Sequence, residues 1–268
     1  MCVPKMALIK KIREYYEREA LELKNHQKEM YFGNPWNTYW HGTRLREILR
    51  MAKTISFNSF LDVGCAEGYH IKLLEKLANR AKNEGLYIVG VDIARNYLLK
   101  AKKRCNGLLV VGDAHKLPFK ENSFELVLCS EVLEHVLHPQ QAFKELVRTS
   151  RKFILLTVAG ENLFYYFTKK LGLAKVKDPF TKIGHGHIHE ARIAETIIPW
   201  ALGAECEPVE SIVTCYFPLA FLQKHKTPTF FISVIKFVDK IINKLPVLRE
   251  LGAVQIVLLQ KKKAYNFK

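Results

Sequence analysis

Short apolar runs alternate with stretches of helical periodicity across the middle of this sequence, and this alternation limits the possible folds more than any other feature. The runs are Ser59 to Val63, Leu86 to Val91, Leu108 to Val111, Phe124 to Cys129 and Lys152 to Thr157. Strands that alternate with helices predict βαβ units and a mostly parallel sheet with helices on both faces. Two later runs, Ser211 to Tyr216 and Ala253 to Leu259, predict a hairpin-like pair that completes a doubly wound α/β sheet of seven strands.

The pattern of helical, apolar and basic stretches predicts four segments. Residues 1–53 are expected to form a cap, in which a helical arm from Lys5 to about Glu29 precedes an aromatic loop from Tyr31 to Gly42. Residues 54–216 are the α/β core, 217–250 a helical insertion, and 251–268 the last strand with a basic tail. The aromatic side chains of the loop either line a ligand pocket or pack under the arm, and packing is the commoner role of such residues.

Composition restricts the partners and the compartment. A formal net charge of +16 over 268 residues favours an acidic partner such as nucleic acid, anionic lipid or a phosphorylated substrate, although part of the excess lies in a terminal lysine run. The six cysteines form no C-x-x-C pair, which argues against structural zinc and for a reducing compartment. We find no signal peptide and no apolar run of about 20 residues, so we expect a cytoplasmic protein, peripheral at the membrane at most.

The turn after the first apolar run carries a first binding motif. Asp62-Val63-Gly64-Cys65-Ala66-Glu67-Gly68 follows a predicted strand and opens a helix, where glycines let the backbone approach a ligand. Asp62 places a negative charge beside this turn. Because that charge repels phosphate, the motif favours a cationic ligand over a dinucleotide pyrophosphate.

Two further acidic residues end the next two predicted strands. Asp92 lies 24 residues after Gly68, where a carboxylate can accept hydrogen bonds from two ribose hydroxyls. Asp113, in Gly112-Asp113-Ala114, can accept from an adenine amino group while the amide of Ala114 donates to a ring nitrogen. Three strand ends therefore converge on one adenosine.

The segment from about Phe60 to Thr157 resembles a class I S-adenosylmethionine-dependent methyltransferase, of the broad type that includes ubiquinone and menaquinone methyltransferases. The resemblance rests on motifs in the family's order, L-D-V-G-C-A-E-G, V-G-V-D-I, G-D-A-H-K-L-P-F-K-E-N-S-F-E-L-V-L-C-S and E-V-L-E-H-V. It implies a Rossmann-like fold, S-adenosyl-L-methionine as cofactor and S-adenosyl-L-homocysteine as product.

The resemblance also implies roles for individual residues. The residues implied at the cofactor's methionine end are Asp62, Gly64, Ala66 and Gly68. At the adenosine, Asp92 binds ribose, Ile93 packs on adenine, and Asp113 with Ala114 contacts the base edge. Ser130 belongs to the same site. Ala66 stands where the family often has glycine. We expect this change to be tolerated, because only a left-handed backbone would make alanine costly there.

The segment after the fourth predicted strand offers candidates for catalysis. Glu131, Glu134 and His135 are spaced i, i+3 and i+4, so on a helix they would share one face and could hold a divalent metal or supply a general base. Small-RNA 2′-O-methyltransferases and some quinone-precursor O-methyltransferases pair a similar E-x-x-E-H with a later histidine around a metal, and His187 is the counterpart here.

The roles of these four residues stay open at this point. His135 and His187 are the candidate bases or substrate contacts, and Glu131, Glu134, His135 and His187 are the candidate metal ligands. The alternative is that they cap helices and form supporting hydrogen bonds.

The insertion contains an amphipathic basic helix. Its apolar residues fall at helical spacing between Phe230 and Leu245, and Lys236, Lys240 and Lys244 form a stripe at intervals of four. Residues 229–245 could therefore lie at a membrane interface, or pack as a lid or dimer contact.

The substrate hypotheses belong to two classes. A small or lipid-linked acceptor is favoured over RNA, because the basic tail has few interleaved aromatic residues and no RNA-binding module is recognisable. A cofactor-binding regulatory protein without catalysis is the non-enzymatic alternative. The oligomeric state and the type of atom methylated do not follow from these patterns.

Overall fold

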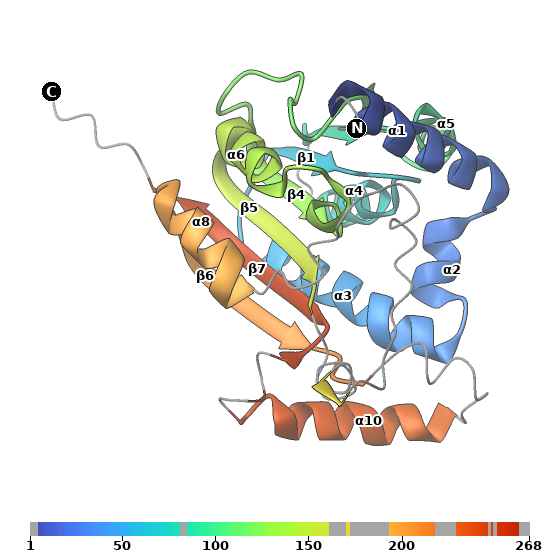
Figure 1. Ribbon diagram of the computed structural model, residues 1–268, viewed down its shortest axis with the longest axis vertical. Helices are drawn as coiled ribbons and strands as arrows, with labels where there is room; N and C mark the ends of the chain where they lie inside the picture. The colour runs from blue at the N-terminus through green and yellow to red at the C-terminus, as the bar shows by residue number, and fades with distance from the viewer. Residues whose placement is uncertain are drawn as a thin grey trace, which may run out of the picture.

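The computed structural model describes residues 5–80, 85–160, 170–171, 193–217, 229–245, 248 and 251–262. Its centre is a seven-stranded sheet in the order β3-β2-β1-β4-β5-β7-β6 (Figure 1). The strands are β1 Ser59–Val63, β2 Tyr87–Asp92, β3 Leu108–Val111, β4 Phe124–Ser130, β5 Ser150–Ala159, β6 Cys206–Thr214 and β7 Val254–Lys261. Strands β1 to β5 pair in parallel and β7 runs antiparallel to both of its neighbours, which confirms the predicted fold class.

The register of the central strands brings their carboxyl ends together. Val63 pairs with Val91 on one side and with Cys129 on the other, and Asp92 pairs with Val111. The turns that follow β1, β2, β3 and β4 therefore leave the sheet at the same edge, which is where open α/β sheets bind ligands.

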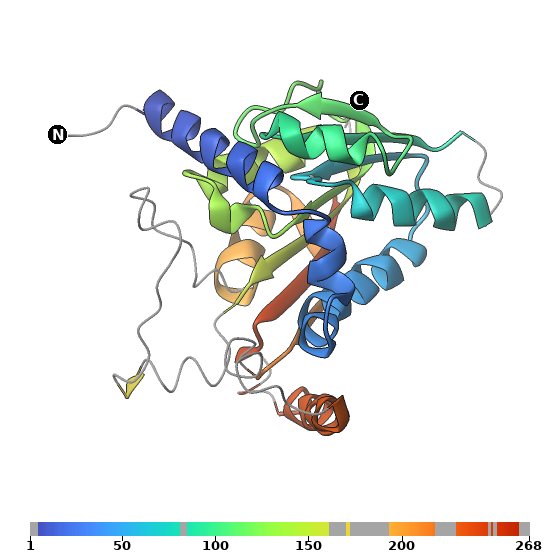
Figure 2. The same ribbon diagram turned by 90° about the vertical axis from the view of Figure 1, so that its right-hand side faces the viewer.

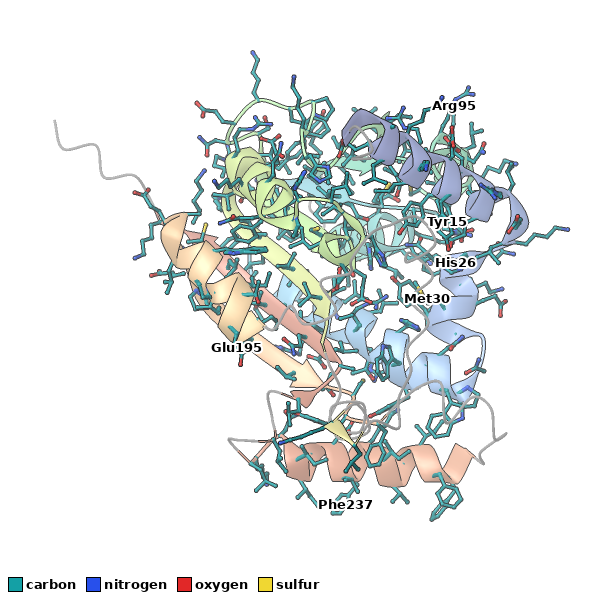
Figure 3. The ribbon with its side chains drawn as sticks, viewed as in Figure 1. Tyr15, His26, Met30, Arg95, Glu195 and Phe237 are labelled. Carbon is teal, nitrogen blue, oxygen red and sulfur yellow. The ribbon has the colours of Figure 1, made fainter. Side chains whose placement is uncertain are left out.

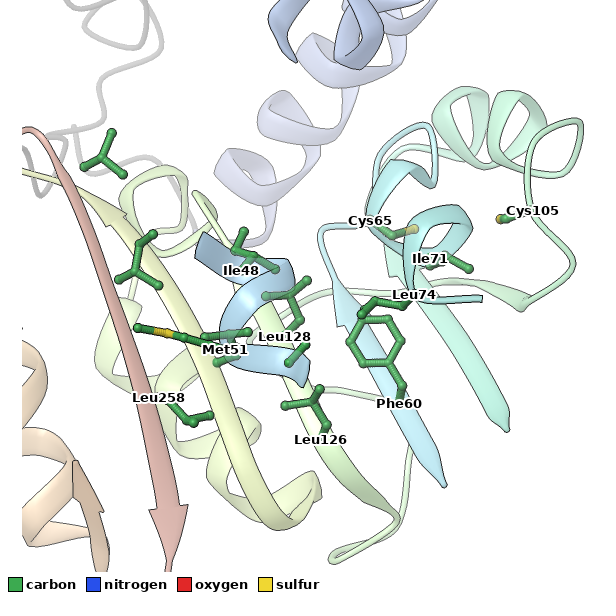
Figure 4. Packing of buried hydrophobic residues seen from close by; sticks show 14 of the residues in the cluster. Ile48, Met51, Phe60, Cys65, Ile71, Leu74, Cys105, Leu126, Leu128 and Leu258 are labelled. Carbon is green, nitrogen blue, oxygen red and sulfur yellow. The ribbon is translucent and has the colours of Figure 1, made fainter. Parts of the chain in front are cut away.

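Successive side chains of each buried strand pack alternately into two separate cores, one on each face of the sheet. On one face Phe60, Leu126 and Leu128 pack with Ile48 and Met51 of a helix, as Figure 4 shows. On the other face Leu61, Val63, Val127 and Cys129 pack under a second group of helices. This two-residue alternation explains why the runs read as continuously apolar, since both faces of a parallel sheet are covered.

Helices cover the two faces as two layers. The helices are α1 Lys5–Glu22, α2 His26–Phe32, α3 Pro35–Lys53, α4 Tyr69–Arg80, α5 Arg95–Ala101, α6 Pro139–Thr149, α8 Ile198–Gly203 and α10 Thr229–Ile242, with a 3-10 turn η1 at Leu133–His135 and a π-helical turn η3 at Ile193–Ile197. Residues of α3, α4, α5 and α10 belong to the first core. Those of α6, η3 and α8 belong to the second. In the described part of the chain, no helix is long and apolar enough to cross a membrane.

The N-terminal region differs from its prediction. Instead of one arm and an aromatic loop, three helices occur, with a break at Asn25, whose φ is 53°. The aromatic segment is helical because Asn34 Oδ1 caps α3 by accepting from the amides of Trp36 (3.0 Å) and Asn37 (2.8 Å), and Pro35 occupies the first turn. An Asn-Pro pair is a helix start signal, and it outweighed the loop signal of Gly33 and Pro35.

Strand β6 also departs from its prediction, because it begins at Cys206, five residues before Ser211. The early part was missed since Glu207, Pro208 and Glu210 break the apolar pattern. These residues suit an edge strand, and the pairing with β7 has an irregularity between Pro208 and Glu210. Helix α10, in the predicted insertion 217–250, lies at the opposite end of the molecule from α1, in the lower part of Figures 1 and 2.

Candidate active site

A cavity of about 420 Å³ lies at the carboxyl edge of the sheet. Its wall includes most of the residues assigned to the cofactor from the sequence, namely Gly64, Ala66, Asp92, Ile93, Asp113, Ala114 and Ser130, together with Glu131 and His135. Asp62, Gly68 and Glu134 are absent from that wall. His187 lies outside the described residues.

The turn after β1 has a left-handed backbone at three positions. The φ angles are 73° at Gly64, 44° at Ala66 and 75° at Gly68. A Cβ on Gly64 would lie 2.3 Å from Val132 Cγ2, so both backbone angle and space require glycine there. The left-handed backbone that we expected to make alanine costly is present at residue 66, so Ala66 carries strain.

Asp62 lies beneath this turn and is fully buried. His70 Nδ1 is 3.5 Å from Asp62 Oδ2, and His70 Nε2 is 3.0 Å from the hydroxyl of Tyr31. Within the described ranges, Asp62 Oδ1 has no hydrogen-bond partner. A buried carboxylate with an unsatisfied oxygen favours a ligand that brings a positive charge.

Asp92 joins the turn after β1 to the turn after β2. Its Oδ2 accepts from the Ala66 amide at 2.9 Å and its Oδ1 from the Ala94 amide at 2.8 Å. Burial raises the pKa of Asp92 to about 6, although these two hydrogen bonds oppose the rise. Each carboxylate oxygen keeps a further lone pair, so the side chain can still accept two ligand hydroxyls.

Asp113 is held by the residue two positions later. Its Oδ1 lies 2.9 Å from the His115 amide nitrogen and 2.7 Å from His115 Nδ1. Burial opposes ionisation of Asp113, but the His115 hydrogen bonds keep its pKa below the ordinary value. An ionised, partly buried acceptor therefore ends β3 at the cavity wall.

Residues 61–152 match the family model described as "Methyltransferase domain". A demethylmenaquinone methyltransferase from Shouchella clausii is 25% identical over 151 residues, which are 50% of this chain and 62% of that protein. The chain spans only 20% to 62% of the length of the first curated relatives that it matches.

Solved structures share the fold across nearly the whole chain. A magnesium protoporphyrin IX methyltransferase from Synechocystis PCC 6803 with bound SAH has a TM-score of 0.58 at 13% identity, covering 94% of this chain and 98% of that one. A possible histamine N-methyltransferase from Thermotoga maritima has a TM-score of 0.58 at 16% identity, covering 94% and 100%. Residues 61–152 therefore form a methyltransferase domain. The methyltransferase domain predicted from the sequence is confirmed by the family match, and the Rossmann-like fold by the solved structures.

The catalytic candidates of the methyltransferase domain are not arranged as predicted. Glu131 has a φ of 56°, and only the short 3-10 turn η1 follows, so no α-helix carries Glu131, Glu134 and His135 on one face. The helix that follows, α6, begins at Pro139. A proline at the first turn and the left-handed residue after β4 explain why the i, i+3, i+4 argument fails.

The three side chains instead have separate partners. Glu131 Oε2 is 2.8 Å from Arg44 NH1, whereas the buried Glu134 Oε1 accepts from the Ala159 amide. Burial, and next the charge of Glu131, raise the pKa of Glu134, which favours its neutral form. His135 lies at the cavity wall, where its ring makes an edge contact with Tyr16 at 6.3 Å between centroids.

This arrangement does not bring Glu131, Glu134 and His135 together on one helical face, which the metal hypothesis assumed. An arginine beside Glu131 competes with a cation for that carboxylate, and the buried Glu134 already accepts from the Ala159 amide. No group of three histidine, cysteine, aspartate or glutamate residues suited to a metal occurs in the portion of the chain that the structure describes.

Sequence reasoning missed two polar residues of α3 that line the cavity, His41 and Arg44. Arg44 is 2% exposed, and among the described residues its Nε has no hydrogen-bond partner. Burial, followed by the charge of Arg44, lowers the pKa of His41 to about 2, so this imidazole is neutral. No motif marks these residues, and only the tertiary packing of α3 beside the β1 turn identifies them.

Helix α1 covers the cavity from outside the sheet. Ile9, Ile12, Tyr15 and Tyr16 line the wall, as do His26 and Met30 of α2; Tyr15, His26 and Met30 are labelled in Figure 3. The Glu17 carboxylate accepts from the amides of Arg95 and Asn96 at 2.8 Å each, and so caps α5, whose own N-cap Ala94 has no side-chain acceptor.

Proposed function

We propose that this protein transfers the methyl group of S-adenosylmethionine by in-line displacement to a small or lipid-linked acceptor. The observation that carries the proposal is the convergence of the left-handed turn after β1, Asp92 and Asp113 on one cavity wall. The finer statements, which concern the acceptor and the role of each residue, extend beyond what the family comparisons establish.

The residues present fit the cofactor. Asp92 is assigned to the two ribose hydroxyls, Ile93 to one face of adenine, and Asp113 with Ala114 to the base edge. The methionine end carries an ammonium and a carboxylate. The unsatisfied Asp62 Oδ1 and Arg44 Nε have the matching opposite charges, so we assign the ammonium to the Asp62 side of the turn and the carboxylate to Arg44.

When bound, S-adenosylmethionine supplies an electrophilic methyl group on a sulfonium. The protein's own work is then to align an acceptor lone pair with the carbon–sulfur bond and to exclude water. His135 is the described residue best placed to remove or hold an acceptor proton, since it shares the wall with Ser130 and packs against Tyr16 of the covering helix. His187 remains a second candidate by sequence alone.

The side of the cavity formed by α1 supports an apolar or lipid-linked acceptor. Ile9, Ile12, Tyr15 and Tyr16 present aliphatic and aromatic surface, and the carboxylate that α1 adds to this wall, Glu19, accepts from the Tyr97 hydroxyl at 2.7 Å. A small number of polar groups within an apolar wall is typical of sites for small molecules. RNA, favoured only by net charge, would require an open basic groove, so it is the second candidate.

The test is transfer of labelled methyl from the cofactor into a native cell extract that is then separated into lipid, small-molecule, RNA and protein fractions. We expect label in the lipid or small-molecule fraction, and none with the Asp92→Ala variant. Label confined to RNA would replace our acceptor class with the second candidate. Cofactor binding by calorimetry without label in any fraction would identify a regulatory protein instead.

A further inference from the structure

Helix α10 is held to the core by its inner side. Ile232 and Ile235 are buried in the first core. The Tyr39 hydroxyl donates to Asp239 Oδ2 at 2.6 Å, and the Tyr216 amide donates to Asp239 Oδ1 at 3.4 Å. These contacts fix which side of the helix faces outward.

The outer side of α10 is apolar and exposed. Phe230, Val234, Phe237 and Ile241 are spaced by four, three and four residues, so they form one stripe, which Phe231 and Leu245 extend. Phe230 is 71% exposed and Phe237 is 64% exposed. In Figure 3 the Phe237 side chain points away from the body of the molecule. We name the residues from Phe230 to Leu245 that face outward the α10 outer face.

Positive charge borders this apolar stripe. Lys236, Lys240 and Lys244 are exposed and repeat every four residues, which places them along one edge of the stripe. Asp239 is the only acidic residue from Phe230 to Leu245, and it is buried on the inner side. The α10 outer face therefore combines large apolar side chains with lysines and presents no carboxylate.

We propose that the α10 outer face docks into the headgroup region of an anionic lipid bilayer. An apolar stripe flanked by lysines matches both the acyl boundary and the negative surface of such a bilayer. A second copy of this chain fits less well, because each copy carries a net charge of +16 and would bring lysines against lysines.

The strand that precedes α10 in the chain ends at the same edge of the sheet as the cavity. Strands β5 and β6 are both antiparallel to β7, so they run parallel to each other, and their last residues Ala159 and Thr214 both pair with Val254. Strand β6 therefore ends at the carboxyl edge of the sheet, the edge that holds the cavity. Docking requires no methyl transfer and stands independently of the proposed activity.

The experiment is flotation of the full chain with vesicles of phosphatidylcholine containing about one third phosphatidylglycerol, compared with phosphatidylcholine alone. We expect wild-type protein to float with the anionic vesicles and to bind neutral vesicles at least about tenfold more weakly. Two double variants should each bind the anionic vesicles about tenfold or more weakly. They are Phe230→Ser with Phe237→Ser, and Lys240→Glu with Lys244→Glu.

Two controls match these variants. Phe32→Ser removes a phenylalanine that is 53% exposed on α2, and Lys102→Glu/Lys103→Glu makes the same charge change after α5. Both should float like wild type. In a Phe237→Trp variant, brominated lipid should quench the fluorescence of the new tryptophan more strongly than that of the native tryptophans. This measurement reports insertion without weakening the surface.

Four outcomes would overturn the proposal. These are absence of wild-type flotation, retained binding by both outer-face variants, equal loss in the matched controls, and a wild-type dimer that the outer-face substitutions dissociate while vesicles bind no form of the protein. Circular dichroism and cofactor calorimetry establish that each variant is folded.

Discussion

At the scale of single residues, Ala66 has a backbone conformation that is unfavourable for its side chain. Its φ of 44° lies in the left-handed region, which costs a residue with a Cβ about 1–2 kcal/mol. We expect Ala66→Gly to raise the free energy of unfolding by about 1 kcal/mol, because relief of this strain exceeds the entropy cost of glycine. Urea unfolding measures the change.

The matched control is Ala142→Gly in α6, a buried helical alanine with an ordinary backbone. It should lower the free energy of unfolding by about 1 kcal/mol. If both substitutions destabilise equally, the backbone at residue 66 is not strained and the assignment of this turn is wrong.

We expect Asp92 to make cofactor binding depend on pH. With its pKa raised to about 6, the free protein binds this proton more tightly than the unfolded chain, so the contribution of Asp92 to stability decreases as pH rises through the interval from 3.8 to 6. Ribose hydroxyls donate to the ionised form, so cofactor affinity has the opposite sign and should fall below pH 6. About one unit below the pKa, the affinity should be roughly tenfold weaker.

Calorimetry between pH 5 and pH 7.5 tests this dependence. Asp92→Asn should bind the cofactor weakly at every pH and lose the step near pH 6. A step that persists in Asp92→Asn would assign the titration to another group.

Arg44 can be tested separately from the adenosine contacts. S-adenosylhomocysteine keeps the amino-acid end, whereas 5′-methylthioadenosine lacks it. Arg44→Met should lower the affinity for S-adenosylhomocysteine by about tenfold to a hundredfold, because a charge-assisted hydrogen bond is lost. The affinity for methylthioadenosine should stay within about twofold of wild type. Asp92→Ala should weaken both ligands. Equal losses of the two ligands in Arg44→Met would contradict a contact with the cofactor's carboxylate.

At the scale of elements, α1 is attached to α5 through the side chains of Glu17 and Glu19. Glu17 supplies the cap that α5 lacks, and the Tyr97 hydroxyl donates to Glu19 at 2.7 Å. Removal of a helix cap costs about 1 kcal/mol. Glu17→Ala should therefore accelerate hydrogen exchange of α1 amides about fivefold and speed dissociation of the cofactor.

Glu14→Ala is the control for this prediction. Glu14 lies on the same helix and forms an exposed 3.9 Å pair with Lys10, which contributes little. Unchanged exchange in Glu17→Ala, or the same acceleration in Glu14→Ala, would show that the cap does not hold α1 over the cavity.

The predictions at element scale succeeded where burial alone decides the pattern. The strands β1, β2 and β4 were located from apolar runs because both of their faces are buried. The prediction was wrong from Tyr31 to Gly42 and at the start of β6. In both places local capping or an exposed edge, rather than burial, determines the backbone.

At the scale of the whole molecule, the sequence by itself determined the fold class, the methyltransferase domain and the strand-end residues that we propose bind adenosine. Each of those features depends on residues close in the chain, namely apolar runs and the polar residues that end them. The parallel register then carries them to one edge without further information.

Only the tertiary structure decided which side chains line the part of the cavity that we propose holds the methionine end, and which helices cover it. Arg44, His41 and Tyr16 come from helices far from the strand ends in sequence, and neither spacing nor composition links them to Gly64. The same holds for α10, whose amphipathic pattern was visible but whose outward side was not. That choice depends on the burial of Ile232 and Ile235 and on Asp239, which accepts from the Tyr39 hydroxyl.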